Sequence, residues 1–295
     1  MKQVIFSKNP VKFPWHDCAN FRARRTRALG SGKFRDHTFE IWQCKECGVG
    51  FTEPIPTEAT ARFLYESRQS NDFQADSSDT MARVKFIAAQ RDVRAFASGL
   101  SPTSILDFSC GDGMFTLALQ KLFSSSRVCG SDLHDSPPLM LKSDQYLPQD
   151  QLRKDAWDLI LCRHVLEHSY NPIAMLQMLR GLLREGGTLA IEVPALDCGA
   201  TALFGKYWDG FYVPYHPIHF TRASLRRTME ASGFAVTREG NAEMPKMGRS
   251  IQNILNCSYN VGLFALGALL QPVQILASRI SGVPTCLRIW GKKVS

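Results

Sequence analysis

The stretch SILDFSCGDGMF, residues 104–115, has the pattern of a strand, a glycine turn and the start of a helix. An apolar run stops at Asp107, and Gly111 and Gly113 follow one residue apart. Glycine lets a backbone approach a ligand closely and adopt angles that other residues avoid. The helix expected from Met114 offers unpaired N–H groups in its first turn. We therefore expect a ligand site at this strand end, beside a carboxylate.

Strand-like and helix-like segments alternate along the chain around this stretch. Strands are predicted at 104–108, 128–131, 158–162, 188–193 and 234–238, with a short one at 139–142, and helices at 114–123, 172–183 and 224–232. Such alternation predicts an α/β protein with a Rossmann-like, doubly wound parallel sheet and helices on both faces. Ligands of such sheets sit at the carboxyl ends of the strands.

The rest of the chain suggests smaller additions to this sheet. Residues 1–60 are basic and interrupted by proline, which predicts a small ribbon-like module, and 101–295 hold the main domain. Residues 61–100 predict a helical linker, whose apolar face comprises Val84, Ile87, Ala88, Val93 and Phe96.

The net charge of +8 is concentrated near the start of the chain, because residues 1–35 hold nine Lys or Arg and one acid, Asp17. A basic arm can meet nucleic acid, an anionic membrane or a phosphorylated substrate, or it can be a solvated face. The run RARRTR, residues 22–27, contains no aromatic side chain, which disfavours single-stranded nucleic acid.

Nine cysteines are spread along the chain, most of them singly in apolar surroundings. This distribution favours a reducing compartment over a disulfide framework. The first residues lack the apolar run of a signal peptide, so we expect a cytoplasmic protein.

A helical insertion is expected at 256–280, and its apolar part, 261–278, holds Gln271, Pro272 and Gln274. This part is short for a membrane-spanning helix, which needs about 20 apolar residues. A helical hairpin in the core or at an oligomer interface is one interpretation. An in-plane contact with a membrane is the other.

The glycine turn favours one cofactor class over another. A dinucleotide site needs a third glycine where this chain has Thr116, and Asp107 would repel a pyrophosphate. A cationic, phosphate-free nucleoside suits the carboxylate better, and S-adenosylmethionine is such a ligand. The run DFSCGDG, residues 107–113, resembles the first motif of class I S-adenosylmethionine-dependent methyltransferases, D-x-x-C-G-x-G.

This resemblance implies a set of cofactor-binding residues. Asp132 ends the next strand and would accept hydrogen bonds from both ribose hydroxyls. Asp144 would lie at the adenine edge, although Pro137-Pro138 indicates that the usual helix between these two positions is shortened. The complete set is Asp107, Ser109, Cys110, Gly111, Gly113, Asp132, Leu133, Asp144, Arg163 and His164.

Residues 157–194 resemble the block of this superfamily that holds its fourth and fifth strands, including the run VLEH at 165–168. The resemblance places Arg163 and His164 near the methionine moiety of the cofactor. Glu167 and His168 are expected to cap the next helix, with a structural role for His168.

Cys44-Lys-Glu-Cys47 is one knuckle of a zinc ribbon, and a tetrahedral site needs two more ligands. The region resembles the zinc-ribbon module that precedes some methyltransferases acting on sugars and secondary metabolites. Its first knuckle has only Cys18, so zinc binding would require His16 as the fourth ligand. The alternative is two thiols on a tight turn.

The segment YWDGFYVPYHPIHFT, residues 207–221, is rich in tyrosine and histidine and ends at an expected helix N-cap, Thr221. Likeness to the sugar methyltransferases implies that His216 is the general base, a task that suits histidine because its pKa lies near neutrality. Tyr215 and His219 are further catalytic candidates. Glu192, at the end of the 188–193 strand, is expected to face the same space and to bind acceptor hydroxyls.

Three functions remain open at this stage. The first is methylation of a small molecule, such as a sugar or a glycosylated or nucleotide-linked intermediate. The second is methylation of a membrane lipid or quinone, and the third is an inactive, methyltransferase-like interaction subunit. Nucleic-acid methylation is disfavoured, because the chain lacks the N/D-P-P-Y/F and Pro-Cys signatures. An oligomer is compatible with each function.

Overall fold

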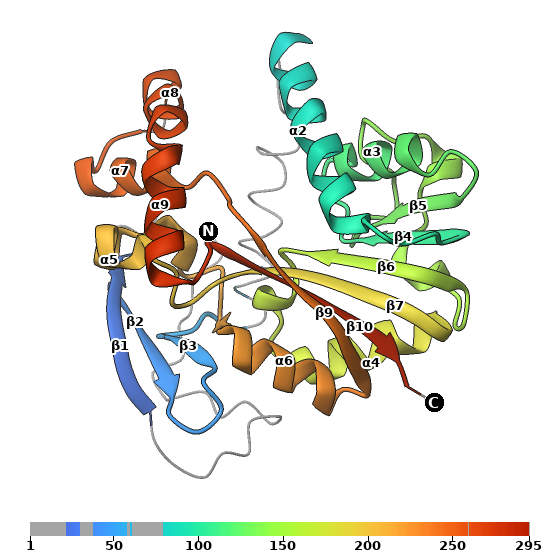
Figure 1. The fold of residues 1–295 in the computed structure, drawn as a ribbon, viewed down its shortest axis with the longest axis horizontal. Coiled ribbons are helices and arrows are strands. Elements are labelled where there is room, and N and C mark those ends of the chain that lie inside the picture. The colour runs from blue at the N-terminus through green and yellow to red at the C-terminus, as the bar shows by residue number, and fades with distance from the viewer. Residues whose placement is uncertain (1–21, 30–37, 58–59, 61–78, 259, 295) are drawn as a thin grey trace.

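The structure is a computed structural model that describes residues 22–29, 38–57, 60, 79–258 and 260–294. It contains a six-stranded sheet in the order β5-β4-β6-β7-β10-β9 and a four-stranded sheet in the order β1-β2-β3-β8 (Figure 1). The predicted α/β fold is confirmed. Residues 1–21 of the predicted ribbon-like module and residues 61–78 of the predicted helical linker lie outside the described residues.

Four neighbouring strands of the large sheet are parallel, whereas β10 runs antiparallel to both of its neighbours. The strands are β4 (Ser104–Phe108), β5 (Arg127–Ser131), β6 (Trp157–Arg163), β7 (Leu183–Pro194), β9 (Phe234–Ala242) and β10 (Cys286–Lys293). The sequence analysis missed β10. It follows the apolar insertion and lacks a helix after it, so the strand–helix alternation does not mark it.

Helices cover both faces of this sheet, as predicted (Figure 1). One face packs against α2 (Asp79–Ala97) and α3 (Met114–Leu122), the other against α4 (Pro172–Leu182) and α6 (Arg222–Ala231). Val93 and Phe96 of α2 are fully buried, but Ile87 is 64% exposed. The predicted apolar face of this helix is therefore correct only in its second half.

Side-chain caps fix where two of these helices begin. The Thr221 hydroxyl accepts from the Ser224 N–H, which confirms the predicted N-cap of α6. Asn171 caps α4 by accepting from the Ala174 N–H, with proline in the first turn. The expected capping by Glu167 and His168 is wrong, because they form a separate turn of 3₁₀ helix, Leu166–His168, before this cap.

The chain between β5 and β6 contains only short 3₁₀ turns, Ser143–Gln145 and Gln149–Gln151, so the helix after β5 is shortened as predicted. The strand expected at 139–142 is wrong. An isolated parallel bridge instead joins Gly130 to Tyr146.

The small sheet joins the first part of the chain to the segment before α6. Its strands are β1 (Arg22–Leu29), β2 (Thr38–Cys44), β3 (Gly50–Glu53) and β8 (Ile218–His219), with antiparallel pairing throughout. The Thr52 hydroxyl donates to the His216 carbonyl at 2.7 Å. The small sheet thereby holds the tyrosine- and histidine-rich segment in place.

The apolar insertion forms α7 (Met247–Leu255), α8 (Val261–Leu269) and α9 (Gln271–Ser281), beside the short helix α5 (Ala200–Phe204) and beyond one end of the large sheet (Figure 1). Among the described residues, no single helix has the length and apolarity to cross a membrane, while α8 and α9 together, bent by 47°, pass that test. The core interpretation is wrong, because Leu269 and Ile280 are 76% and 79% exposed.

Candidate active site

The glycine turn lies across the ends of β4 and β5. Ser109, Gly111 and Gly113 all have positive φ angles, of 59°, 58° and 81°. The Cys110 N–H donates to the Ser131 carbonyl at 3.0 Å, and the Cys110 carbonyl accepts from the Gly113 N–H at 3.1 Å. Glycine permits this path, which brings bare backbone to the start of α3.

Asp132 closes the turn from the neighbouring strand. Its Oδ2 accepts from the Gly111 N–H at 2.9 Å, and its Oδ1 accepts from the Leu133 N–H at 2.7 Å. A carboxylate offers about four acceptor positions, so lone pairs remain for ligand hydroxyls. The structure thus brings the predicted turn and the predicted ribose ligand into contact.

The adenine side is shaped by the shortened loop. A Cβ on Gly113 would lie 2.5 Å from Leu141 Cγ, so only glycine fits there. Leu133 is 67% exposed beside Asp132. Asp144 is exposed in the Ser143–Gln145 turn, and its role at the adenine edge stays a prediction.

Asp107 is buried, whereas the sequence analysis expected its carboxylate to face the ligand at the strand end. It is 3% exposed and accepts a 2.6 Å hydrogen bond from the Thr116 hydroxyl. Burial raises the pKa of Asp107 to about 6, although Thr116 and the charge of Arg163 oppose the shift. Thr116 stands where a dinucleotide motif has its third glycine, and here it supplies a partner for the strand-end acid.

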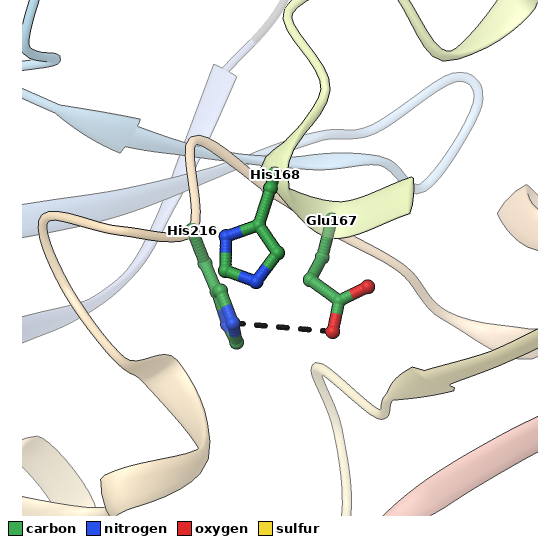
Figure 2. Close-up of side chains that lie close together, drawn as sticks. All are labelled: Glu167, His168 and His216. Carbon is green, nitrogen blue, oxygen red and sulfur yellow. Dashed lines mark ion pairs between the residues drawn. The ribbon is translucent and has the colours of Figure 1, made fainter. Parts of the chain in front are cut away.

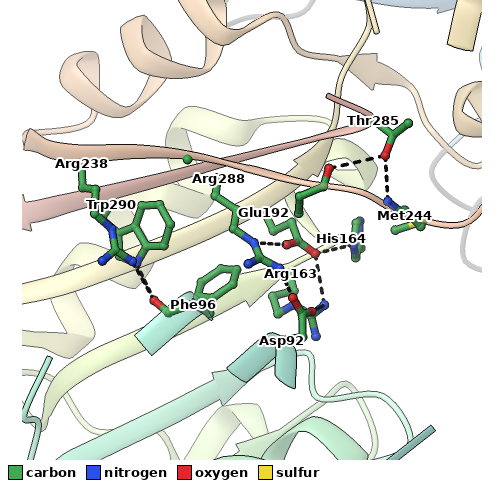
Figure 3. Close-up of polar contacts among 12 residues, drawn as sticks. Asp92, Phe96, Arg163, His164, Glu192, Arg238, Met244, Thr285, Arg288 and Trp290 are labelled. Atoms are coloured by element: carbon green, nitrogen blue, oxygen red, sulfur yellow. Dashed lines mark hydrogen bonds and ion pairs between the residues drawn. The ribbon is translucent and has the colours of Figure 1, made fainter. Parts of the chain in front are cut away.

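A row of charged side chains crosses three adjacent strands at the cleft. Arg163 of β6, Glu192 of β7 and Arg288 of β10 are register neighbours, and Asp92 of α2 closes the group (Figure 3). Arg163 Nη2 lies 3.1 Å from Glu192 Oε1 and 2.7 Å from Asp92 Oδ2. Arg288 pairs with both acids as well. We call these four residues the charged row.

The charged row forms part of a cleft of about 740 Å³ between α2, the glycine turn and α9. Burial raises the pKa of Glu192, but Arg163, His164 and Arg288 outweigh burial and hold it well below its usual range. The Glu192 oxygens are therefore committed to neighbouring cations rather than open to acceptor hydroxyls. The sequence analysis missed Asp92 and Arg288, because the charges in QRDVRAF (residues 90–96) and CLRIWGKK (residues 286–293) gave no signal of a shared row.

His164 connects the cleft to a second group of polar residues. Its Nε2 lies 2.9 Å from Glu192 Oε1, and its Nδ1 lies 3.4 Å from Glu167 Oε1, an ion-pair contact without hydrogen-bond geometry. Burial lowers the pKa of His164, but the two carboxylates outweigh it and the net shift is upward. The backbone supports this position, since His164 has a φ of 54°.

The second group comprises Glu167, His168 and His216, and we call it the histidine cluster (Figure 2). His216 Nε2 lies 3.9 Å from Glu167 Oε1, and the rings of His168 and His216 are 4.6 Å apart. One ligand atom from each residue lies within 4.8 Å of the other two, a donor set of two imidazoles and one carboxylate that also suits a transition metal.

Glu167 and His216 of the histidine cluster have buried side-chain atoms without a hydrogen bond from the described residues. Within the described part of the chain, neither Glu167 side-chain oxygen nor His216 Nδ1 has a hydrogen-bond partner. Both side chains are nearly inaccessible, at 2% and 6%. Burial, followed by the charges of His168, His219 and Lys246, holds the pKa of His216 well below its usual value. The His216 ring is therefore neutral near pH 7, and because burial disfavours its charged form, its protonation depends on a nearby negative charge.

The other catalytic candidates have structural contacts. His219 Nε2 lies 2.8 Å from the Thr52 hydroxyl, and burial lowers the pKa of His219 to about 3. The Tyr215 carbonyl lies 2.8 Å from His168 Nδ1, and the Tyr215 ring stacks on Tyr212. These contacts join the segment to β3 and to the 3₁₀ turn, as expected for a structural role of His168.

The proposed zinc knuckle forms a tight turn. The Cys44 N–H donates to the Val49 carbonyl at 2.9 Å, and the Gly48 N–H donates to the Cys44 carbonyl at 3.0 Å. Cys44 is buried and Cys47 is half-buried. His16 and Cys18 lie outside the described residues, so zinc stays a prediction.

A parallel sheet with a glycine turn, a strand-end acid beside it and a cleft at the carboxyl ends defines a Rossmann-like, nucleoside-cofactor enzyme. Residues 82–239 match the family model of the methyltransferase domain, and the chain belongs to this family. The enzyme is an S-adenosylmethionine-dependent methyltransferase, so the alternative of an inactive interaction subunit is not retained.

Among curated proteins, the ubiquinone biosynthesis O-methyltransferase of Histophilus somni (strain 2336) is 26% identical over 137 residues. The match covers 41% of this chain, and the chain spans about half the length of that relative, 54%.

Among solved structures, Burkholderia thailandensis 1,6-didemethyltoxoflavin-N1-methyltransferase, with bound 1,6-didemethyltoxoflavin and S-adenosylhomocysteine, has a TM-score of 0.50 at 15% identity. The match covers 92% of this chain and 100% of that one. A SAM-dependent methyltransferase from Archaeoglobus fulgidus has a TM-score of 0.47 at 18% identity, covering 79% and 99% of the two chains. At these identities the likeness concerns the fold alone.

Proposed function

We propose that the enzyme methylates a hydroxyl group of a small-molecule acceptor and that His216 is the general base. The observation that carries this proposal is the His216 imidazole, whose Nδ1 has no hydrogen-bond partner among the described residues and whose Nε2 faces Glu167, with both side chains nearly inaccessible to solvent. A buried polar atom without a partner costs roughly 1–3 kcal/mol, so it is best explained by a ligand that satisfies it.

The residues of the glycine turn fit the cofactor. Gly111 and Gly113 adopt the positive φ angles that the turn needs, and Asp132 keeps acceptor positions for the ribose. When bound, S-adenosylmethionine would supply a methyl group on a cationic sulfur for transfer to the acceptor oxygen, with S-adenosylhomocysteine as the leaving group. Arg163 and His164 line the neighbouring cleft, in keeping with their predicted place near the methionine moiety.

The histidine cluster handles the proton of the acceptor hydroxyl. His216 takes this proton while the oxygen–carbon bond forms, because an ether oxygen cannot keep it. Glu167, 3.9 Å away, stabilises the resulting imidazolium by its negative charge. His168 holds the cluster together through its contact with the Tyr215 carbonyl.

A sugar, or a glycosylated or nucleotide-linked intermediate, is the first acceptor class we propose. The cleft wall carries Arg91, Asp92, Asp112 and Glu243 beside apolar side chains, which suits a polar ligand with several hydroxyls. The tyrosine- and histidine-rich segment and the Cys44–Cys47 turn also follow the pattern of the zinc-ribbon sugar methyltransferases.

A quinone-like or lipid acceptor is the second candidate, and α9 is the observation that favours it. Gln271 and Ile275 of this helix line the cleft, while Val273, Leu276 and Ile280 are exposed on its other side. The cleft is thus bordered by a helix whose other side exposes apolar side chains. The name of the Histophilus relative, a ubiquinone biosynthesis O-methyltransferase, also points to a quinone-like acceptor.

The test measures transfer of labelled methyl groups from S-adenosylmethionine to two panels, nucleotide sugars and O-demethylated quinones. With an acceptor in hand, His216→Asn should lower kcat by about 10²–10⁴-fold, the usual worth of a general base. The S-adenosylhomocysteine Kd, measured by calorimetry, should stay unchanged.

An unchanged kcat would overturn the assignment of His216. A chelator forms the second arm, because the histidine cluster could also hold a metal. Loss of wild-type activity with the chelator, restored by a divalent cation, would replace the base role with a metal site.

A further inference from the structure

Helices α8 and α9 carry an apolar surface outside the site described above. Large apolar side chains are exposed on both helices, and we call them the α8–α9 surface: Val261, Phe264, Leu266, Leu269, Val273, Leu276 and Ile280. Val261, Leu269 and Ile280 are 81%, 76% and 79% exposed. Such a concentration on neighbouring helices exceeds the scattered single residues normal for a protein surface.

Helix α8 has almost no protein cover. Within Val261–Leu269 only Leu263 and Gly267 are buried. Gly267 lies against α7, where an added Cβ would come 2.7 Å from the Gly248 nitrogen. An apolar helix is normally buried on all sides in a protein or a membrane. This one contacts the rest of the chain along a single narrow strip and leaves its other sides uncovered.

The charged side chains of α7, α8 and α9 are basic. These helices contain Arg249 and Arg279 and no Asp or Glu, whereas Lys246, Arg288 and Lys293 outside them pair with acids. Arg279 is exposed on α9, three residues after Leu276 of the apolar surface. Exposed apolar side chains beside an exposed cation on the same helix match the interfacial region of an anionic bilayer.

We propose that the α8–α9 surface docks on an anionic lipid membrane, with both helices lying in the interface. The two helices form a bent pair, since α8 ends at Leu269, α9 starts at Gln271 and the angle between them is 47°. The opposite side of α9 lines the active-site cleft through Gln271 and Ile275. Docking therefore places the cleft at the lipid surface. This proposal does not depend on which acceptor is methylated.

The experiment is flotation of the full chain with vesicles of phosphatidylcholine, alone or with phosphatidylglycerol. The wild type should float with the phosphatidylglycerol vesicles. The triple variant Leu269→Gln, Val273→Gln and Leu276→Gln should bind at least tenfold more weakly, because burying one such side chain is worth roughly tenfold or more. Met178→Gln on α4, 43% exposed, is the matched control and should bind like the wild type.

A charge variant separates electrostatic attraction to anionic lipid from nonspecific apolar binding. Arg279→Glu should weaken binding to phosphatidylglycerol vesicles and leave the small binding to phosphatidylcholine unchanged. S-adenosylhomocysteine binding by each variant shows that the fold is intact, and methyl transfer to a soluble acceptor should persist.

Three results would overturn the proposal. They are failure of the folded wild type to bind either vesicle, equal binding by the triple variant, and a wild-type dimer in sedimentation that the triple variant loses without any vesicle binding. The last result would assign the surface to a second copy of the chain. None of them changes the evidence for methyl transfer, which is measured without vesicles.

Discussion

The charged row and the histidine cluster are two buried polar groups joined by His164, and they differ in how well their members are paired. In the charged row, Glu192 contacts Arg163, His164 and Arg288. In the histidine cluster, Glu167 has ion-pair contacts at 3.4 and 3.9 Å without a hydrogen bond from the described residues. In the charged row both carboxylates are paired and, of its side-chain atoms, Arg163 Nε lacks a hydrogen bond from the described residues, whereas in the histidine cluster both oxygens of the only carboxylate lack one.

This difference separates positioning from chemistry. A satisfied buried ion pair fixes the relative place of the elements that supply it, here α2, β6, β7 and β10. An unsatisfied buried group costs free energy and persists in a protein when a ligand or a reaction uses it. We therefore assign the charged row to shaping the cleft and the histidine cluster to proton transfer.

The largest expected effect tests the charged row. Glu192→Gln removes one charge and leaves Arg163 and Arg288 partly unpaired in a buried place. Breaking a buried pair in this way costs about 3–5 kcal/mol of the free energy of unfolding. Urea denaturation measures it, with Glu230→Gln in the exposed Arg226–Glu230 pair as a control that should change little. A loss below 1 kcal/mol would contradict the positioning role.

Asp107 is an intermediate case, a buried acid with one neutral donor, Thr116. Its pKa is raised from 3.8 to about 6, so the folded state holds the proton more tightly than the unfolded state. This contribution to stability is complete below about pH 4 and is lost as the pH rises through 6. Asp107→Asn should therefore gain up to about 3 kcal/mol over the wild type at pH 8, and nothing at pH 4. Urea titrations at both pH values test this, and equal differences would contradict it.

Asp132 is a satisfied acid that still faces the cofactor side. Asp132→Ala removes the acceptor for the Gly111 and Leu133 N–H groups and the predicted ribose ligand. We expect S-adenosylhomocysteine binding to weaken by ~1.5–3 kcal/mol, the worth of a hydrogen bond to a charged group. Calorimetric titration measures the change, and Asp144→Ala tests the predicted adenine contact by the same method. Equal affinity of Asp132→Ala and the wild type would place the ribose elsewhere.

The smallest effect on stability tests the histidine cluster with the substitution used on the charged row. Glu167→Gln should change the free energy of unfolding by less than about 1 kcal/mol, because no hydrogen bond of the described residues is lost. It should still lower kcat about tenfold, since the carboxylate stabilises the imidazolium of His216 by roughly 1.4 kcal/mol. A large loss of stability with normal turnover would reverse the roles of the two groups.

The sequence by itself determined the elements whose signals are local. Short-range periodicity marks the strand in 104–115 and the strand that ends just before Asp132. Glycine chemistry marks the turn, and side-chain hydrogen bonding marks the Thr221 cap. These features were enough to place the cofactor turn. The fold class followed from their alternation, because parallel strands need crossover helices.

Only the tertiary structure decided how distant charges meet. Arg288 and Glu192 are 96 residues apart, and their contact depends on the antiparallel register of a strand that the sequence pattern did not mark. The exposure of α8 was equally hidden, since an apolar run looks the same whether protein or lipid covers it. Local pattern sets the type of an element, whereas register and burial depend on partners far along the chain.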